Sequence, residues 1–181
     1  MAERRIIVEG LKLNYKGLFK ATELYQLIDN WLREKGYDKR EIRNQEHATK
    51  EGKYIELEME PWKKITDYAN TKIRLEIKML NVTETAVNVD GKKVNMNMGK
   101  IHIRFDGYLE TDYEHRWENR PVYLFIRTLM DKFIYSSYTH QFEGELAENI
   151  GQLYDVIKGF RNLYKLTSQP GISPHYSERH A

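Results

Sequence analysis

The most constraining feature of this chain is a strict alternation of polar and apolar residues over 100–114. Polar side chains occupy the even positions from Lys100 to Glu114, and apolar side chains occupy most odd positions from Ile101 to Tyr113. This period predicts a strand with one buried face, and at roughly 3.3 Å per residue the strand would extend about 50 Å. A strand of that length must curve in a compact domain, and Gly107, the gap in the apolar row, is the expected bend.

A helical pattern follows this strand. Pro121 is expected to open a helix, because proline fits the first helical turn, and apolar residues recur at helical spacing over 122–134 and 142–164. A straight helix from 121 to 166 would be about 69 Å long, whereas a compact chain of this size has a radius of gyration of roughly 16 Å. We therefore expect a kink or break in 136–141, where good helix formers are missing.

Shorter patterns predict the other elements. Alternation and turn residues indicate strands at 4–15, 41–48, 53–60, 72–79, 82–89 and 92–98. Gly10 falls at a phase change that is typical of a bulge, and Asp90-Gly91 is a hairpin loop signal. A helix is expected over 18–35, with Gly36 as its left-handed C-terminal cap.

The predicted fold is α+β: a curved antiparallel sheet of six or seven strands wrapped around a long C-terminal helical segment, with one helix after the first strand. Residues 1–166 are expected to form one domain and 167–181 a disordered tail. The chain has no cysteine, which excludes disulfides and thiolate sites and agrees with a cytoplasmic protein. Charged residues interrupt the most apolar stretch, 122–138, so it cannot cross a bilayer.

The charge balance limits the expected partners. There are 29 Lys and Arg against 27 Asp and Glu, a net charge of +2, which argues against a protein that mainly binds a phosphate backbone. A local basic patch of Lys100, His102 and Arg104 remains an alternative surface site for nucleic acid or anionic lipid.

The acidic residues on the strands have two interpretations. Asp106, Glu110, Asp112 and Glu114 share one strand face, as do Glu56, Glu58 and Glu60 on an earlier strand. Such carboxylates can act as acid and base or hold a hard cation. Their alternation with an apolar row favours the solvated outer face of a sheet.

Catalytic and metal motifs are missing from the sequence. None of the six histidines has the spacing of a zinc site, and we expect no catalytic residue, no metal and no cofactor. His115, near Trp117 where the long strand gives way to the helix, is the single enzymatic candidate, for which a packing role is the alternative.

Methionine and aromatic residues on the predicted inner rows indicate a ligand pocket. Methionine adapts to irregular ligands and tyrosine offers a polar group inside an apolar pocket, although a closed core filled by methionine would give the same pattern. The pocket candidates are Met59, Met79, Met96, Met98, Phe105, Tyr113, His115, Trp117, Met130 and Phe133.

The order of elements resembles that of the helix-grip superfamily, which includes START-like, polyketide-cyclase-like and birch-pollen-allergen-like proteins. The segments that carry the resemblance are 4–15, 18–35, 41–114 and the helix after Pro121, matched by topology and not by a motif. The resemblance implies a cavity for lipids, sterols or polyketides between a curved sheet and its last helix. The chain departs from the family in having one longer helix after the first strand and a longer C-terminal helical region.

Three functions follow from these observations. The first is binding of a small apolar ligand between the sheet and the C-terminal helix. The second is an adaptor or scaffold that binds protein, RNA or a membrane surface through its exposed charged strand face or extra helix. The third is an enzyme that uses His115 or cavity-facing tyrosines.

Overall fold

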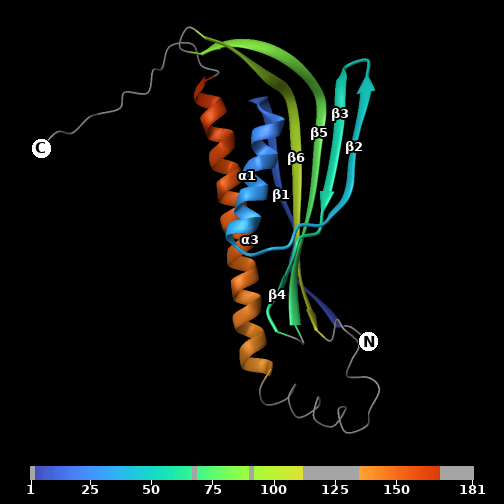
Figure 1. The fold of residues 1–181 in the computed structure, drawn as a ribbon, viewed down its shortest axis with the longest axis vertical. Helices are drawn as coiled ribbons and strands as arrows, with labels where there is room; N and C mark the ends of the chain where they lie inside the picture. Colours follow the sequence, from blue (N-terminus) through green and yellow to red (C-terminus); the bar gives the residue numbers. More distant parts are fainter. Residues whose placement is uncertain (1–2, 67–68, 90–91, 112–134, 168–181) are drawn as a thin grey trace, which may run out of the picture.

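The computed structural model describes residues 3–66, 69–89, 92–111 and 135–167. These residues form an α+β fold with a six-stranded antiparallel sheet and two helices (Figure 1). The strands are β1 (Glu3–Phe19), β2 (Glu41–Thr49), β3 (Gly52–Met59), β4 (Trp62–Lys64), β5 (Ala69–Val89) and β6 (Lys92–Thr111). The helices are α1 (Ala21–Glu34) and α3 (Tyr135–Thr167).

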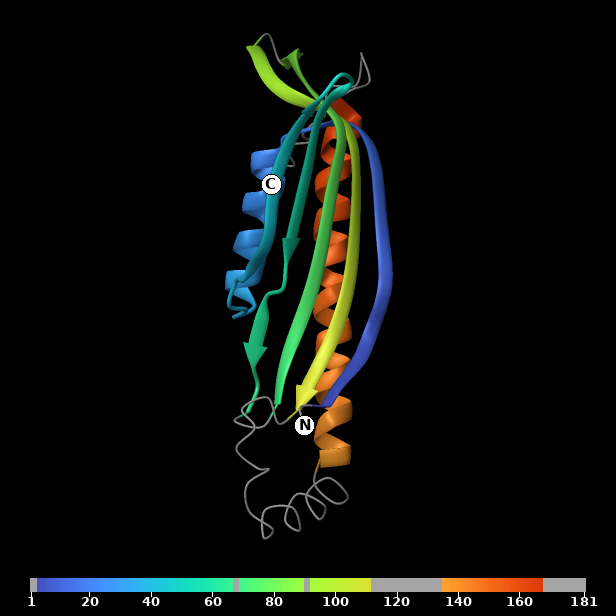
Figure 2. The ribbon, with the colours of Figure 1, turned by 90° about the vertical axis from the view of Figure 1, so that its right-hand side faces the viewer.

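The sheet has the strand order β1-β6-β5-β3-β2, with β4 paired to β5 beside this path. β5 and β6 pair from Ala69 opposite Thr111 to Val89 opposite Lys92, which confirms the predicted pairing on either side of Asp90-Gly91. The turn itself lies outside the described residues. Both helices lie on one face of the sheet (Figure 1), and Figure 2 shows the sheet from the opposite face.

The predicted relation between the alternating strand and the C-terminal helix is confirmed. β6 is a strand through Thr111, and its inward side chains Ile101, Ile103 and Phe105 share one core with α3. The α3 side of this core is Leu146, Ile150, Leu153 and Ile157, each at most 2% exposed. The inward side chains of β6 and the buried side chains of α3 therefore belong to one continuous core.

Gly107 of β6 lies directly against two side chains of α3. A Cβ atom at Gly107 would lie 2.4 Å from Cδ1 of Ile150 and 3.5 Å from the nearest atoms of Leu146. Any side chain would therefore displace the buried end of Ile150. The missing side chain at Gly107 thus leaves room for Ile150 of α3. Figure 1 also shows that the long strands of the sheet are curved.

Two glycine predictions on the N-terminal half are confirmed. The β1–β6 register shifts between Val8 and Leu11, and Gly10 has a φ of 63°, as expected of a bulge. Gly36 has a φ of 73° and directs the N–H of Tyr37 to the carbonyl of Leu32 at 2.8 Å, which closes the end of α1.

Two predicted boundaries are wrong, and the structure adds one short strand. α1 begins at Ala21 instead of residue 18, because Leu18 and Phe19 still pair with β6. The runs 72–79 and 82–89 form a single strand, β5, whose register shifts between Leu80 and Thr83. The connection after Pro61 contains the short strand β4.

The predicted break in 136–141 is also wrong, since these residues lie inside α3. Helix propensity is a weak prior that tertiary contacts override, and this end of α3 is tied to the sheet. Glu143 pairs with Arg5 of β1 at 2.6 Å, and Glu145 pairs with Lys63 of β4 at 3.0 Å. Pro121 and residues 122–134 lie outside the described residues, as does the predicted tail from residue 168 onward.

Neither helix of the described chain combines the length and the low polarity that a bilayer-spanning helix requires.

Candidate functional site

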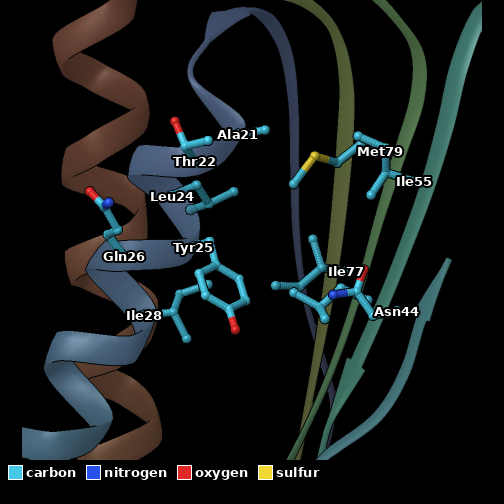
Figure 3. Close-up of a pocket in the computed structure, with 11 residues that line it drawn as sticks. Ala21, Thr22, Leu24, Tyr25, Gln26, Ile28, Asn44, Ile55, Ile77 and Met79 are labelled. Carbon is cyan, nitrogen blue, oxygen red and sulfur yellow. The ribbon is translucent and has the colours of Figure 1, made fainter. Parts of the chain in front are cut away.

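A cavity of about 450 Å³ lies between α1 and the sheet (Figure 3). It is lined mainly by apolar side chains from α1, β3 and β5. The lining residues are Ala21, Thr22, Leu24, Tyr25, Gln26, Ile28, Asn44, Ile55, Leu57, Ile77 and Met79.

The periodicities of helix and strand explain this lining. Ala21, Leu24, Tyr25 and Ile28 follow the spacing i, i+3, i+4, i+7, which places them on one face of α1. The opposite wall consists of the inward residues of two neighbouring strands, with Ile55 opposite Met79 and Leu57 opposite Ile77. Two apolar surfaces thus face each other across the space.

The space remains because the two helices do not cover the whole sheet. α3 contacts β1, β6 and β5, and α1 packs beside it. β2, at the far edge, is exposed at every position. At the start of α1 the sheet-facing stripe begins with the small Ala21, so the first turn of the helix fills less of the space than a larger side chain would.

The mouth of the cavity is polar. Thr22 and Gln26 of α1 and Asn44 of β2 line the cavity and are exposed to solvent. Tyr25 reaches the same region: its hydroxyl donates a hydrogen bond to Glu41 and accepts one from Lys39. The Nζ of Lys39 also lies 4.2 Å from the centre of the Tyr25 ring, a cation–π distance.

A charge cluster of Asp29, Lys39 and Glu41 fixes Tyr25. Nζ of Lys39 lies 2.8 Å from Glu41 and 3.2 Å from Asp29. Partial burial lowers the pKa of Lys39, but its hydrogen bonds with Glu41, Tyr25 and Asp29 outweigh burial and raise the pKa above its ordinary value. The hydrogen bond from Lys39 lowers the pKa of Glu41. Arg33 lies 2.9 Å from Asp29, so two cations and two carboxylates pair with one another in this region of the surface.

The predicted pocket residues are dispersed in the structure. Met79 lines the cavity, while Met59, Met96 and Phe105 are buried elsewhere at 1%, 4% and 0% exposure. Met98 is 41% exposed, so its assignment to an inner row is wrong. Tyr113, His115, Trp117, Met130 and Phe133 lie outside the described residues.

The cavity also lies under a different helix from the expected one. On the described part of α3, Leu146, Ile150, Leu153 and Ile157 are buried members of the core, whereas α1 borders the cavity. The α1 residues were missed because their stripe has the pattern of an ordinary core-facing helix. The one available signal was Tyr25, a side chain with a polar end inside that apolar stripe.

The outer-face carboxylates are less solvated than predicted. Asp106, Glu110 and Glu58 are only 2%, 7% and 7% exposed. Glu110 lies 2.5 Å from Arg4 and 2.7 Å from Lys72. Burial raises the pKa of Glu110, but hydrogen bonds from Lys72 and Arg4 outweigh it and lower the pKa below its ordinary value. The aliphatic stems of the neighbouring cationic side chains account for the shielding.

These acids serve as ion-pair partners in the sheet. Glu58 lies 2.6 Å from Arg74, and Asp106 accepts a hydrogen bond of 2.6 Å from the N–H of Gly10 at the bulge. Within the described ranges, no group of three or more His, Asp or Glu residues has an arrangement that could hold a metal ion. Asp112 and Glu114 lie outside those ranges.

The alternative surface site lies on the outward face of β6. Lys100, His102 and Arg104 are all exposed. Nε of Arg104 is 3.0 Å from Asp106, and Nδ1 of His102 is 2.7 Å from the side-chain oxygen of Asn14. Arg104 is therefore already paired.

Comparisons of the chain with protein-family models, with curated proteins and with solved structures give no match.

Proposed function

We propose that this protein binds a small apolar ligand in the cavity between α1 and the sheet. The observation that carries the proposal is the cavity itself, at about 450 Å³. Small-molecule sites in proteins range from roughly 300 to 1,000 Å³ and combine an apolar lining with a few polar groups. The cavity has this composition, with Thr22, Gln26 and Asn44 as the polar groups at its mouth.

The lining also defines the chemistry of the ligand. None of the described residues that line the cavity is charged, and the nearby Asp29, Lys39 and Glu41 are already paired with one another and with Arg33. An ionised ligand would lose hydration without gaining a counter-charge. The preferred ligand is therefore uncharged and mostly apolar, with at most one polar group that reaches the amides of Gln26 and Asn44.

The resemblance to helix-grip proteins supports the same proposal. The chain runs from a strand to a single helix, through an antiparallel sheet, to a second helix. That order is the one on which the resemblance rests, and the family uses the space between sheet and helix for apolar ligands. We place the site under α1, which borders the cavity described above, and not under α3.

An uncharged fluorophore, N-phenyl-1-naphthylamine, tests the proposal, because its emission rises on transfer from water to an apolar site. The informative variant is Thr22→Trp. Thr22 stands at the cavity mouth in solvent contact, so a larger side chain there can cover the apolar wall without displacing the core. The matched control is Asn30→Trp, an exposed position on the same helix that does not line the cavity.

The wild-type protein should bind the fluorophore saturably with one site. Thr22→Trp should weaken binding at least tenfold, which corresponds to about 1.4 kcal/mol, and Asn30→Trp should leave it within twofold. Urea unfolding of each variant should show a single transition like that of the wild type. Absence of saturable binding to the wild type, or equal binding by both variants, would contradict the proposal.

A further inference from the structure

The outer face of the sheet, seen in Figure 2, has two regions with different charge patterns. In the first region opposite charges meet across neighbouring strands. Arg74 lies 2.6 Å from Glu58, and Lys72 lies 2.7 Å from Glu110. Such cross-strand pairs stabilise a sheet, and they make this region a compensated, protein-internal network.

The second region, here termed the basic patch, consists of Lys12, Lys16, Lys78, Lys100 and His102, all exposed. Lys16 lies directly opposite Lys100 in the β1–β6 register, and His102 lies opposite Lys78 in the β5–β6 register. Among the described residues, no carboxylate lies within ion-pair distance of Lys12, Lys16 or Lys100, and Lys78 is 3.8 Å from Glu56.

Protection of a sheet edge does not account for the whole patch. Lysines on an edge strand discourage pairing with another chain, and Lys12 and Lys16 are on the edge strand β1. Lys100 and Lys78 are on β6 and β5, which are paired on both sides. Like charges placed opposite each other destabilise a sheet. Lys100, which lies opposite Lys16, therefore works against folding unless an anion lies across it, whereas Lys78 already has Glu56 at 3.8 Å.

We propose that the basic patch binds the phosphate backbone of double-stranded nucleic acid without reading its bases. The patch spans three neighbouring strands, roughly 10 Å across, and covers about 13 Å along β1 from Lys12 to Lys16. This area suits a few adjacent phosphates. Its side chains are four lysines and a histidine, all able to contact phosphate oxygens.

The composition of the patch selects a duplex over other polyanions. Single-stranded sites combine cations with aromatic side chains on which bases stack, and the patch contains no Phe, Tyr or Trp. Surfaces that dock on anionic membranes insert several apolar side chains beside their cations, whereas the five patch residues are all polar and their exposed apolar neighbour on the described part of β6 is a single methionine, Met98. A duplex keeps its bases stacked inside and presents only its backbone to such a surface.

The salt dependence of binding gives a quantitative test. Fluorescence anisotropy with a labelled DNA duplex should show weak binding, with Kd between about 10⁻⁴ and 10⁻⁶ M. The logarithm of the binding constant should fall against the logarithm of salt concentration with a slope of about −3.6 if all four lysines contact phosphates. The double variant Lys16→Gln, Lys100→Gln should reduce the size of that slope by about 1.8.

The control is the double variant Lys50→Gln, Lys93→Gln, which makes the same change in net charge at exposed positions outside the patch. It should leave the slope within about 0.5 of the wild-type value. Equal slopes for the patch variant and the wild type would overturn the proposal. Tighter binding to a single strand than to the duplex would also overturn it, as would patch-dependent binding to phosphatidylserine vesicles without binding to the duplex.

Discussion

Replacement of Gly107 by alanine tests how α3 sits on the sheet. The new Cβ would lie 2.4 Å from Cδ1 of Ile150, well inside van der Waals contact. Ile150 is fully buried. To avoid the clash, either the Ile150 side chain must change its rotamer or α3 must move away from the sheet. Removing that one methyl with Ile150→Val should make room for the alanine.

The magnitudes follow from the same contacts. Overpacking a core lowers the free energy of unfolding by about 1–3 kcal/mol. Replacing a strand glycine by alanine raises it by about 0.5–1 kcal/mol, because alanine loses less backbone freedom on folding. Gly107→Ala should therefore destabilise the protein by about 0.5–2 kcal/mol. Ile150→Val alone should cost about 0.5–1.5 kcal/mol. In the double variant the alanine methyl occupies the space that Cδ1 left, so the protein should be at least as stable as Ile150→Val.

Urea unfolding of the four proteins gives the coupling energy directly. We expect the two substitutions to couple favourably by about 1 kcal/mol or more, above the 0.3–0.5 kcal/mol (roughly) within which independent sites add. Additive effects would show that Gly107 does not face Ile150. The slopes of the transitions should stay constant, because none of these changes alters the surface exposed on unfolding.

Three further results are expected. Glu110→Gln should lower stability at pH 7 by about 1–3 kcal/mol because it leaves Arg4 and Lys72 without their carboxylate. Folding lowers the pKa of Glu110 below its ordinary value of 4.5. The stabilisation by its carboxylate is therefore fully present above that value and is lost as the pH falls through the lower pKa of the folded state. The difference in the free energy of unfolding between variant and wild type, measured by urea unfolding, should accordingly disappear in acid. Leu146→Ala should cost about 2–5 kcal/mol and lower the Tm by roughly 2–4 °C per kcal/mol, measured by circular dichroism. Tyr25→Phe should leave fluorophore binding within threefold, because the ring stays in the cavity wall and only the hydroxyl at the charge cluster is lost.

The sheet was predictable because its residues repeat with period two. Strands with one buried face, such as β3 and the part of β6 from Lys100 onward, carry that signal along their length. The apolar row that begins at Ile101 predicted which face of the sheet packs against α3. Gly10 predicted the bulge in β1 and Gly36 predicted the end of α1, because the left-handed backbone at both positions strongly favours glycine.

The site was not predictable in the same way. A cavity is a difference between the volume that two surfaces enclose and the volume that their side chains fill, and periodicity reports only which side chains face inward. The sequence therefore placed Met79 and Met59 on inner rows alike, although one lines the cavity and the other is sealed in the core. The pairing of β1 with β6, which brings Lys16 opposite Lys100, likewise depends on contacts distant in the chain.

Methyl NMR of the protein labelled at its methionines measures the proposed site most directly. On titration with an uncharged apolar ligand such as N-phenyl-1-naphthylamine, the Met79 methyl should shift progressively to saturation, because that side chain lines the cavity. The methyls of Met59 and Met96, which are buried but do not line the cavity, should move little. A stationary Met79 signal at saturating ligand, or larger shifts at Met59 and Met96, would contradict a binding site beneath α1.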